Sequence, residues 1–483
     1  SSAASDVYKR QPLEGREQRM DAITYGSLFL ILGSTRLSVL TCCISENPGK
    51  HGFLSADAET QEELKDYLLY EEDGHIGLFV MLGETIKPLF YGTVTCMEVK
   101  AQGGRCVLHL EALTESYQMD LTVRNRSFQD VAMTSHQLIQ KILEPYSQSQ
   151  ILFSIEDKAL GQIMVQYQET DWEFLNRVLS AYGASAYIAG NEPGIYLRVG
   201  LMDTEEDADW DLLPYVLHRN AAPRETKKGL KGQICYQIET YDILPLGEKV
   251  LFKGKELYIG KIERFFRQGL FVSRYYLYFA EGLRKLKYYN PFLGGVSING
   301  VVTAASRNRL QAQLETDALA NYRKKYFFPF STVAASPDGS GWYCMPRPGD
   351  QVRIFFPTAD EKESYAIANI QGDSSPASDS PMSRPDLKDI TMPDGKAVRF
   401  IEGGIQLAVG GNKGTVTLTN DGNAEIVTDD DIEISAAEAV CFSTDGMMSV
   451  TAGSRIQFIN DAGGNITVTD ETVKIDAAMI INN

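Results

Sequence analysis

The carboxy-terminal stretch from Val398 to Ile481 constrains the fold most, because short runs of alternating apolar and polar residues recur through it. Alternation with a period of two places apolar side chains on one face of a β-strand and polar side chains on the other. A spacing of roughly eight to ten residues between runs is typical of a β-solenoid or β-helix. The runs are 405–409, 416–419, 432–434, 456–458, 466–468, 473–475 and 479–481.

These runs are too short to supply a core to a single chain. Each run offers few inward side chains, and turn residues separate the runs at 410–412, 420–423 and 461–465. A sheet whose apolar face has no second layer must find one in another molecule. We therefore expect intertwined copies of the chain, arranged as a trimeric β-prism that forms a needle.

Composition and charge exclude several classes of protein. The net charge of −18 opposes binding to the phosphate backbone of nucleic acids. No apolar run approaches the ~18 residues that a membrane-spanning helix needs. The seven cysteines show no CxxC spacing, and such a scattered set fits buried thiols in a reducing cytoplasm. Gly403-Gly404 and Gly410-Gly411 are interpreted as turns, so we expect no cofactor and no bound metal.

The first residues look foreign to the rest of the chain. Residues 1–11 resemble a translated sequencing-library adapter joined to an open reading frame, and the first methionine is Met20. We therefore treat 1–19 as a non-native, disordered leader and expect the natural protein to start near Met20.

The region from about residue 24 to 279 reads mainly as strands, and it contains an internal echo. Leu89–Val94 resembles Leu257–Ile262, and each segment is followed by a glycine-containing turn and another strand. The echo predicts two copies of one β-barrel, placed at 20–118 and 186–295. An extra helix is expected around Glu59 to Leu69.

Two helices are expected between the barrels, in a helical insert at 119–185. The first is predicted to begin with Ser127 as its N-cap and to end at Pro145. The second is predicted to begin at Thr170, which has capping-box spacing with Glu173, and to close at Gly183.

Three further segments complete the chain. Residues 296–372 contain five short strands, which fits a barrel of the OB type. Residues 373–388 are rich in serine, proline and aspartate and are expected to be a linker. Residues 389–483 then form the spike. The predicted fold class is mainly β with a helical insert: tandem β-barrel hub, OB-fold barrel and trimeric β-helix needle.

Three motifs resemble the VgrG family of contractile injection systems and the hub-spike proteins of contractile phage tails. Tyr167–Leu179 resembles the family's helix motif Y-x-E-T-D-x-x-F-x-x-R-L-L. Leu244–Val250 is similar to the start of the second hub barrel, and Pro348–Val352 is similar to P-x-x-G-D-E-V of the OB barrel. The likeness covers essentially all residues beyond about 20, and the collinear order of the parts is its most specific feature.

The resemblance implies a structural protein without catalytic activity. Three copies with two barrels each would form a ring that docks a hexameric inner tube protein and adapts it to a three-fold needle. Implied partners are the baseplate proteins, effector cargo and a PAAR-like tip protein. Such proteins assemble in the bacterial cytoplasm and are then ejected. We expect the tip protein to cover the apolar strand ends at Met479, Ile480 and Ile481.

Sequence leaves alternatives open. A phage or tailocin spike would have the same architecture as a secretion-system spike. Val409-Gly410 stands alone where secretion spikes show dense Val-Gly repeats, and no histidine follows His218 to bind a tip iron. A β-helix enzyme acting on polysaccharide would need paired carboxylates in a cleft on a wider solenoid.

Other candidate groups are weighed against ordinary structural roles. Asp429–Asp431 is interpreted as a solvated turn rather than a calcium site, and Glu71–Asp73 lacks a partner carboxylate. The tryptophans are expected in cores. The basic patch Arg323–Lys325 is expected to be a trimer or hub contact rather than a nucleic-acid site. The histidines, which have no metal-type spacing, are His51, His75, His109, His136 and His218.

Overall fold

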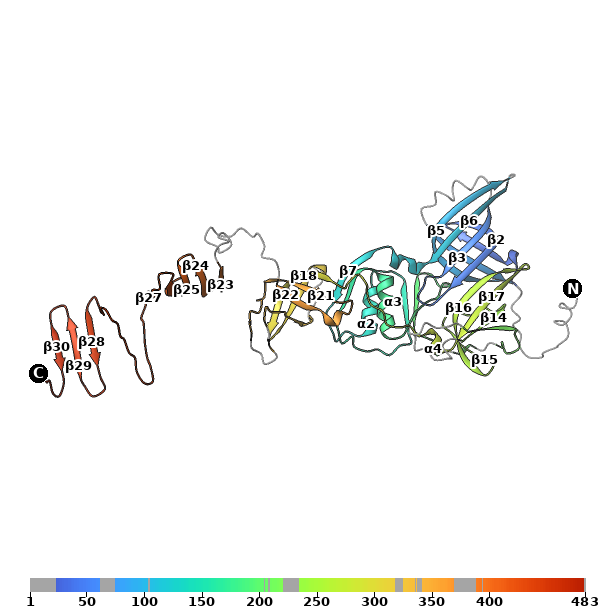
Figure 1. Ribbon diagram of the computed structural model, residues 1–483. Helices are drawn as coiled ribbons and strands as arrows, with labels where there is room; N and C mark the ends of the chain where they lie inside the picture. The colour runs from blue at the N-terminus through green and yellow to red at the C-terminus, as the bar shows by residue number, and fades with distance from the viewer. Residues whose placement is uncertain are drawn as a thin grey trace. The chain divides into compact units, whose positions relative to one another are not determined.

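The chain divides into two compact units, Ser1–Ile370 and Gln371–Asn483, and each is described by itself (Figure 1). The computed structural model is mainly β, as the sequence predicts. It describes residues 23–60, 74–102, 105–203, 205–206, 209–219, 234–317, 325–334, 336, 341–368, 388–392 and 394–481. The predicted leader at 1–19 lies outside these residues.

The first barrel is a closed ring of six antiparallel strands. Its order is β1-β4-β5-β6-β3-β2, and β1 also pairs with β2. The closed ring gives its alternating strands an interior: along β6, every second side chain is buried in the barrel core. The strands are β1 (Leu28–Leu32), β2 (Thr35–Glu46), β3 (Phe53–Thr60), β4 (His75–Leu82), β5 (Thr85–Gln102) and β6 (Arg105–Thr114).

The second barrel repeats the strand order of the first. The order β12-β15-β16-β17-β14-β13 matches β1-β4-β5-β6-β3-β2 strand for strand, although this barrel is only nearly closed. The two barrels form one continuous sheet because β2 pairs with β16. The strands are β12 (Glu205–Glu206), β13 (Tyr215–Arg219), β14 (Ile234–Thr240), β15 (Lys249–Phe252), β16 (Lys255–Arg267) and β17 (Leu270–Tyr278), and α4 (Ala280–Leu283) follows.

The sequence echo lies at equivalent positions of the two barrels, so the prediction of tandem barrels is confirmed. The predicted start of the second barrel at residue 186 is wrong, because residues 186–188 and 195–199 form a separate sheet with residues 149–153. Gly92 in β5 and Gly260 in β16 both lie where strands approach closely. A Cβ atom on Gly92 would lie 2.1 Å from the carbonyl oxygen of Leu113, and one on Gly260 would lie 2.4 Å from the Tyr278 ring. Only glycine fits at either position.

The insert between the barrels mixes strands with its helices. The predicted Ser127 N-cap is wrong: Ser127 lies in β7, which pairs with β9, and its backbone N–H donates to Asp317. The first helix begins later, after Thr134, whose side chain forms a capping box with Gln137. The elements are β7 (Val123–Phe128), α2 (Ser135–Leu143), β8 (Ser149–Phe153), β9 (Met164–Thr170), α3 (Asp171–Ala181), β10 (Ala186–Ile188) and β11 (Ile195–Val199).

Helix α3 begins and ends where the sequence predicts. The Thr170 hydroxyl accepts from the Glu173 backbone N–H, and the Glu173 carboxylate accepts from the Thr170 backbone N–H. Gly183 follows the helix with a φ of 67°, in the left-handed region that glycine adopts freely. The helix expected around Glu59 to Leu69 lies mostly outside the described residues, and Glu59 itself is in β3.

The third barrel of this unit has five strands in the order β20-β19-β18-β21-β22. A parallel bridge between Phe330 and Ala366 joins the two ends of that order. Its own core gathers Leu310, Ile354 and Phe356. The strands are β18 (Val296–Ser306), β19 (Arg309–Leu314), β20 (Phe328–Pro329), β21 (Gln351–Phe356) and β22 (Tyr365–Ala368), and short 3-10 turns lie at Tyr25–Ser27, Glu115–Asp120, Glu315–Asp317 and Glu361–Glu363.

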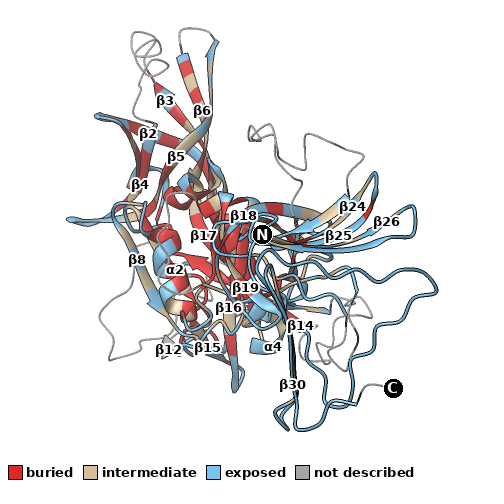
Figure 2. Cartoon of the chain, turned by 90° about the vertical axis from the view of Figure 1, so that its left-hand side faces the viewer, coloured by how far each residue is buried: buried red, intermediate tan, exposed pale blue. Residues whose placement is uncertain are grey.

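The second unit consists of two antiparallel meanders, coloured almost entirely tan and pale blue in Figure 2 because few of their residues are buried. Among its described hydrophobic residues only Ala397 and Ala408 are buried. The runs at 432–434 and 479–481 are not strands. The strands are β23 (Lys388–Thr391), β24 (Ala397–Ile401), β25 (Gly404–Val409), β26 (Gly414–Thr419), β27 (Ala424–Thr428), β28 (Arg455–Ile459), β29 (Asn465–Thr469) and β30 (Val473–Asp476).

Candidate assembly surfaces

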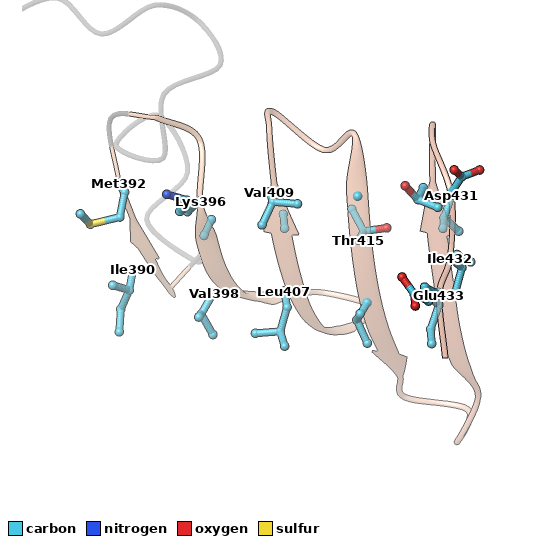
Figure 3. Close-up of a pocket in the computed structure, with 17 residues that line it drawn as sticks. Ile390, Met392, Lys396, Val398, Leu407, Val409, Thr415, Asp431, Ile432 and Glu433 are labelled. Carbon is cyan, nitrogen blue, oxygen red and sulfur yellow. The ribbon is translucent and has the colours of Figure 1, made fainter. Parts of the chain in front are cut away.

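One face of the five-stranded meander is lined by large apolar side chains. Strand register places Ile390, Val398, Leu407, Val416 and Ile426 side by side in a row across all five strands. Figure 3 shows Ile390, Val398 and Leu407 projecting from the same side of the sheet. We call this surface the apolar face. It comprises Ile390, Met392, Val398, Phe400, Ile405, Leu407, Val409, Val416, Leu418 and Ile426.

The apolar face is open to solvent within the described chain. Exposure of its side chains ranges from 36% at Val398 to 59% at Ile426. The opposite face carries a polar row that includes Arg399, Gln406 and Glu425. Covering one large apolar side chain stabilises a protein by about 1.5–3 kcal/mol. Ten such side chains on one face therefore favour strongly any partner that covers them.

The three-stranded meander repeats the same two-faced pattern. Register aligns Ile456, Val468 and Val473 in one row, and Phe458, Ile466 and Ile475 in the next. Polar side chains such as Gln457 and Lys474 point to the other face. A groove of about 630 Å³ on the first meander, which Asp431–Glu433 also lines, is the open apolar face itself rather than an enclosed cavity.

The predicted tip residues are exposed. Met479, Ile480 and Ile481 expose 74%, 63% and 74% of their surfaces, and they extend beyond the last strand, β30. The tip-protein contact stays a prediction.

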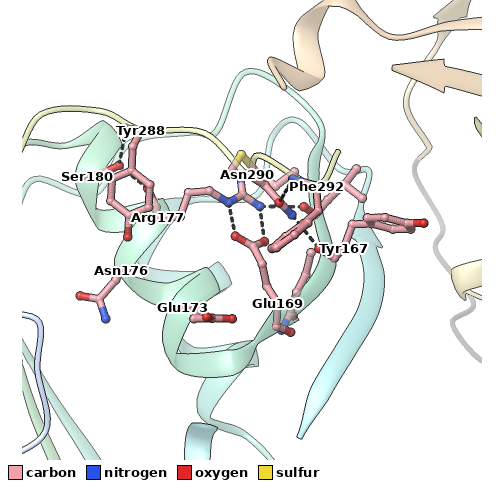
Figure 4. Close-up of polar contacts among 12 residues, drawn as sticks. Tyr167, Glu169, Glu173, Asn176, Arg177, Ser180, Tyr288, Asn290 and Phe292 are labelled. Atoms are coloured by element: carbon pink, nitrogen blue, oxygen red, sulfur yellow. Dashed lines mark hydrogen bonds and ion pairs between the residues drawn. The ribbon is translucent and has the colours of Figure 1, made fainter. Parts of the chain in front are cut away.

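A buried ion cluster joins α3 to the third barrel. The Arg177 guanidinium donates to Glu169 at 2.7 and 2.8 Å and to Glu361 at 2.6 Å, and it also donates to the carbonyl of Val165. Figure 4 shows Arg177 facing Glu169, beside the segment from Tyr288 to Phe292. Burial raises the pKa of Glu169 although Arg177 opposes the rise. One guanidinium thus fixes elements that are far apart in sequence.

The connecting segment is tied to the same helix and strand. The backbone N–H of Tyr288 donates to the Ser180 hydroxyl at 3.2 Å, and the side chain of Asn290 donates to the carbonyl of Tyr167 at 2.7 Å. The path from the second barrel to the third is therefore held against α3 and β9 by hydrogen bonds.

Asp317 makes a second link between the insert and the third barrel. Its carboxylate accepts from the backbone N–H of Ser127 at 2.7 Å, from the Ser127 hydroxyl, and from Gln129 at 3.3 Å. Burial raises the pKa of Asp317 above its ordinary value, although these hydrogen bonds oppose the rise. Neither Asp317 nor Glu361 has a local sequence signal that predicts its role. Ile390, Met392 and Phe400 lie outside the predicted runs, although their alternation is visible in the sequence.

The helix motif that carried the family resemblance is explained by this scaffold. Thr170 caps α3, Phe174 is buried in the core of the insert, and Glu169 pairs with Arg177. Asp171 is fully buried and is bonded by Arg126 at 2.6 Å and by the Tyr146 hydroxyl at 2.7 Å. Glu169, Thr170, Asp171, Phe174 and Arg177 thus act through buried contacts that position neighbouring elements.

The other sequence candidates fall into ordinary surroundings. Asp429–Asp431 is exposed in a bend, as expected. Trp172 and Trp210 are buried, whereas Trp342 is exposed against expectation. Of the cysteines, Cys43, Cys344 and Cys441 are exposed, so the expectation of buried thiols holds only in part. Histidine contacts include His109 with Asp57 at 2.7 Å, His51 with Asp120 at 2.8 Å and His75 with Glu115 at 2.8 Å.

Glu71–Asp73 and two members of the basic patch, Arg323 and Lys324, lie outside the described residues. Within the residues that the structure does describe, no three potential ligand side chains gather where they could hold a metal ion. No helix in that part of the chain has the length and apolar character to cross a membrane.

A known family model matches part of the first unit. Residues 80–213 match the family model of the phage tail baseplate hub (GPD). No curated protein matches the chain. The fold is similar to the E. coli c3393 protein, a type VI secretion component described as similar to T4 bacteriophage tail proteins gp27 and gp5, with a TM-score of 0.51 and 14% identity over 70% of this chain and 98% of that chain.

A second solved structure covers more of the chain. A chain of the Francisella PdpA-VgrG complex in its half-lidded form matches with a TM-score of 0.55 and 9% identity, over 83% of this chain and 87% of that chain. At such identities the likeness establishes the fold. The predicted resemblance is therefore confirmed: the chain contains a baseplate-hub match of the phage tail GPD family at 80–213 and has the fold of VgrG-like hub-spike proteins of phage tails and type VI secretion systems.

Proposed function

We propose that the chain is a structural, non-enzymatic spike and hub that works as a homotrimer in a contractile injection machine. The single observation that carries this proposal is the apolar face, which no described part of its own unit covers. Copies of the same chain are the simplest partner, because each brings an identical face and closed symmetry can bury all of them together. Three sheets packed face to face make a prism.

The two barrels of the first unit support a second part of the proposal, which is docking to the inner tube. Two barrels with the same strand order in each chain give six similar modules in a trimer. Six modules suit a hexameric inner tube, and the OB-type barrel, whose strand order supports that assignment, then leads to the three-fold spike. We propose that this arrangement adapts the tube to the needle, nucleates the baseplate with its proteins and lets the needle pierce the target envelope.

The proposal includes two further partners. A PAAR-like protein would cap the apolar end at Met479–Ile481, and effector cargo would travel with the spike. As part of an ejected machine, the assembled protein would leave the cytoplasm where it forms. A phage tail or tailocin would use the same architecture, and the neighbouring genes for a capsid or for sheath recycling would distinguish them.

The first test is the solution mass of the chain, measured by light scattering after size exclusion. We expect a mass near three chains and an elongated profile. Leu407→Asp places a charge on the apolar face and should yield monomers, whereas Gln406→Asp, on the opposite face, should leave the trimer intact. A compact wild-type monomer would contradict the proposal and favour a single-chain solenoid.

A further inference from the structure

The two barrels differ at one edge. The first is closed by pairing of β1 with β2, whereas β13 pairs only with β14 among the described residues. On β13, Tyr215, Val216 and Leu217 expose 48%, 51% and 53% of their surfaces. An unpaired strand edge with apolar side chains is a docking surface for another strand.

Within the chain, the strand equivalent to β13 is already used to join barrels. β13 takes the place of β2 in the shared strand order, and β2 pairs antiparallel with β16. β16 can accept it because β15 pairs with β16 only as far as Tyr258, while β2 pairs with the part of β16 that starts at Ile262. A buried ion pair between Arg264 and Glu46, at 2.6 Å, lies in this junction.

The strand register shows which residues of the unpaired edge strand β13 correspond to residues of β2. Leu54 in β3 and Ile238 in β14 are both buried and occupy equivalent positions. Leu54 pairs with Ile44, and Ile238 pairs with Tyr215. Tyr215 is therefore the counterpart of Ile44. By the same step along the strand, Val216 corresponds to Ser45 and Leu217 to Glu46.

The first barrel offers the counterpart of the acceptor edge on β5. Aligning Gly92 with Gly260 makes Val94 equivalent to Ile262, and β4 stops pairing with β5 at Thr93. Beyond a bulge at Thr95, Cys96 corresponds to Glu263 and Met97 to Arg264. Like β16, β5 therefore has a stretch, Val94–Glu98, that pairs with only one neighbour among the described strands, and at its start the Val94 backbone N–H donates to the carbonyl of Gly74 at 2.7 Å.

We propose that β13 of one copy pairs antiparallel with Val94–Glu98 of β5 in a second copy, repeating between chains the junction that β2 and β16 make within a chain. The proposal rests on the trimeric hub proposed above. Its chemistry is self-consistent: Val94 would face Leu217 and Met97 would face Tyr215, so apolar contacts replace the Arg264–Glu46 ion pair. The junction then continues one sheet from barrel to barrel around the hub.

The register predicts a cross-link that a single substitution can create. Cys96 should lie opposite Val216 of the next copy, because their counterparts Glu263 and Ser45 pair directly. Paired residues of antiparallel strands have Cα atoms about 4.5–5.5 Å apart, within the range that a disulfide spans. We expect Val216→Cys in the full chain, treated with diamide, to form a disulfide between chains that links residue 216 to Cys96 on peptide mapping.

Matched variants control for chance collisions. Leu251→Cys lies on β15 of the same barrel and exposes a similar 48% of its surface, so it should cross-link at least about tenfold more slowly. Replacing Cys96 with serine should abolish the Val216→Cys bond. Because Val216 is exposed on a strand edge, its substitution should leave the melting temperature of the reduced protein unchanged.

A charge exchange tests the same contact independently. In the Val216→Cys protein, Leu217→Glu should slow cross-linking at least about tenfold, because it brings an unpaired charge into an apolar junction. Adding Met97→Arg should restore the rate, since the pair then reproduces Arg264 and Glu46. A protein with the mass of three chains that forms no bond to Cys96 would overturn the junction and leave the trimer standing. A monomer would overturn both.

Discussion

Residues 23–368 and residues 388–481 are built from the same kind of alternating strand, yet only the first set buries its apolar side chains. All four hydrophobic cores of the described chain lie before residue 367. The spike strands leave Leu407, Leu418 and Phe458 half exposed or more. Alternation alone therefore does not decide whether a strand is stable within its own chain.

The difference is one of closure. In the hub, β1 pairs with β2 and the sheet curls until one face becomes an interior. In the spike, the strands of each meander pair in sequence, and the last described strand does not pair with the first. An open sheet with one apolar face needs a second layer, and here that layer must come from outside the described chain.

Separating the two units should have the largest effect. The hub piece, 23–370, should stay folded and unfold cooperatively even in dilute solution, where the proposed junction between copies dissociates, because its hydrophobic cores lie within one chain. The spike piece, 388–483, should melt at a temperature that rises with concentration, because its fold depends on association. Calorimetry over a hundredfold range of concentration would measure both.

A matched substitution sharpens that contrast. Leu310→Asp buries a charge in the third barrel, where Leu310 is fully buried, and should prevent the hub piece from folding. In the full chain, Leu407→Asp should leave the melting transition of residues 23–370 unchanged. A spike piece that melts independently of concentration would contradict the comparison.

Removing an ion pair should also destabilise the hub more than the spike, although by less than the changes described above. Arg177→Ala leaves Glu169 and Glu361 buried and unpaired, and it should lower the free energy of unfolding of the hub by about 3–5 kcal/mol. Lys474 and Asp476 form a 3.2 Å pair in the spike with side chains 69% and 64% exposed, so Lys474→Ala should cost about 1 kcal/mol or less.

Urea unfolding monitored by tryptophan fluorescence would measure the hub, since Trp172 and Trp210 are both buried there. The spike variant is compared with its parent by the concentration at which the proposed trimer dissociates. A loss below about 1 kcal/mol for Arg177→Ala would show that solvent reaches Glu169 and Glu361 in the variant, and it would contradict this prediction.

Sequence predicted what depends on local pattern. Alternation located five of the eight strands between Lys388 and Asp476, the Thr170–Glu173 spacing located α3, and the repeat around Gly92 and Gly260 located the two barrels. Each of these signals lies within a few residues of the feature that it predicts.

What sequence could not predict depends on contacts between distant residues. Ser127 looked like an N-cap, but pairing of β7 with β9 and the bonds to Asp317 hold it in a strand instead. Glu361 lies 184 positions from Arg177, and only the folded chain brings them together. The stronger capping signal at Thr134 was available and would have corrected the helix start.

The smallest expected effect is a pH dependence confined to the hub. Burial alone would raise the pKa of Asp120, but hydrogen bonds from His51 and Thr170 outweigh it and hold the pKa below its ordinary value. A carboxyl with a lowered pKa stabilises the folded state above its unfolded pKa of about 3.9, and this contribution disappears as pH falls through the folded value.

Asp120→Asn should therefore destabilise the hub at pH 6 by about 1 kcal/mol, and the stabilities of variant and parent should converge as the pH falls below about 3.9 and through the lowered folded pKa. Asp445→Asn, on an exposed segment of the spike, should leave the hub's curve of unfolding free energy against pH unchanged. The measurement is urea unfolding at half-unit steps of pH. A difference in unfolding free energy between parent and variant that stays constant down to pH 3 would mean that Asp120 acts through packing and not through its charge. The stability of the hub, like that of the spike, would then not depend on the titration of Asp120.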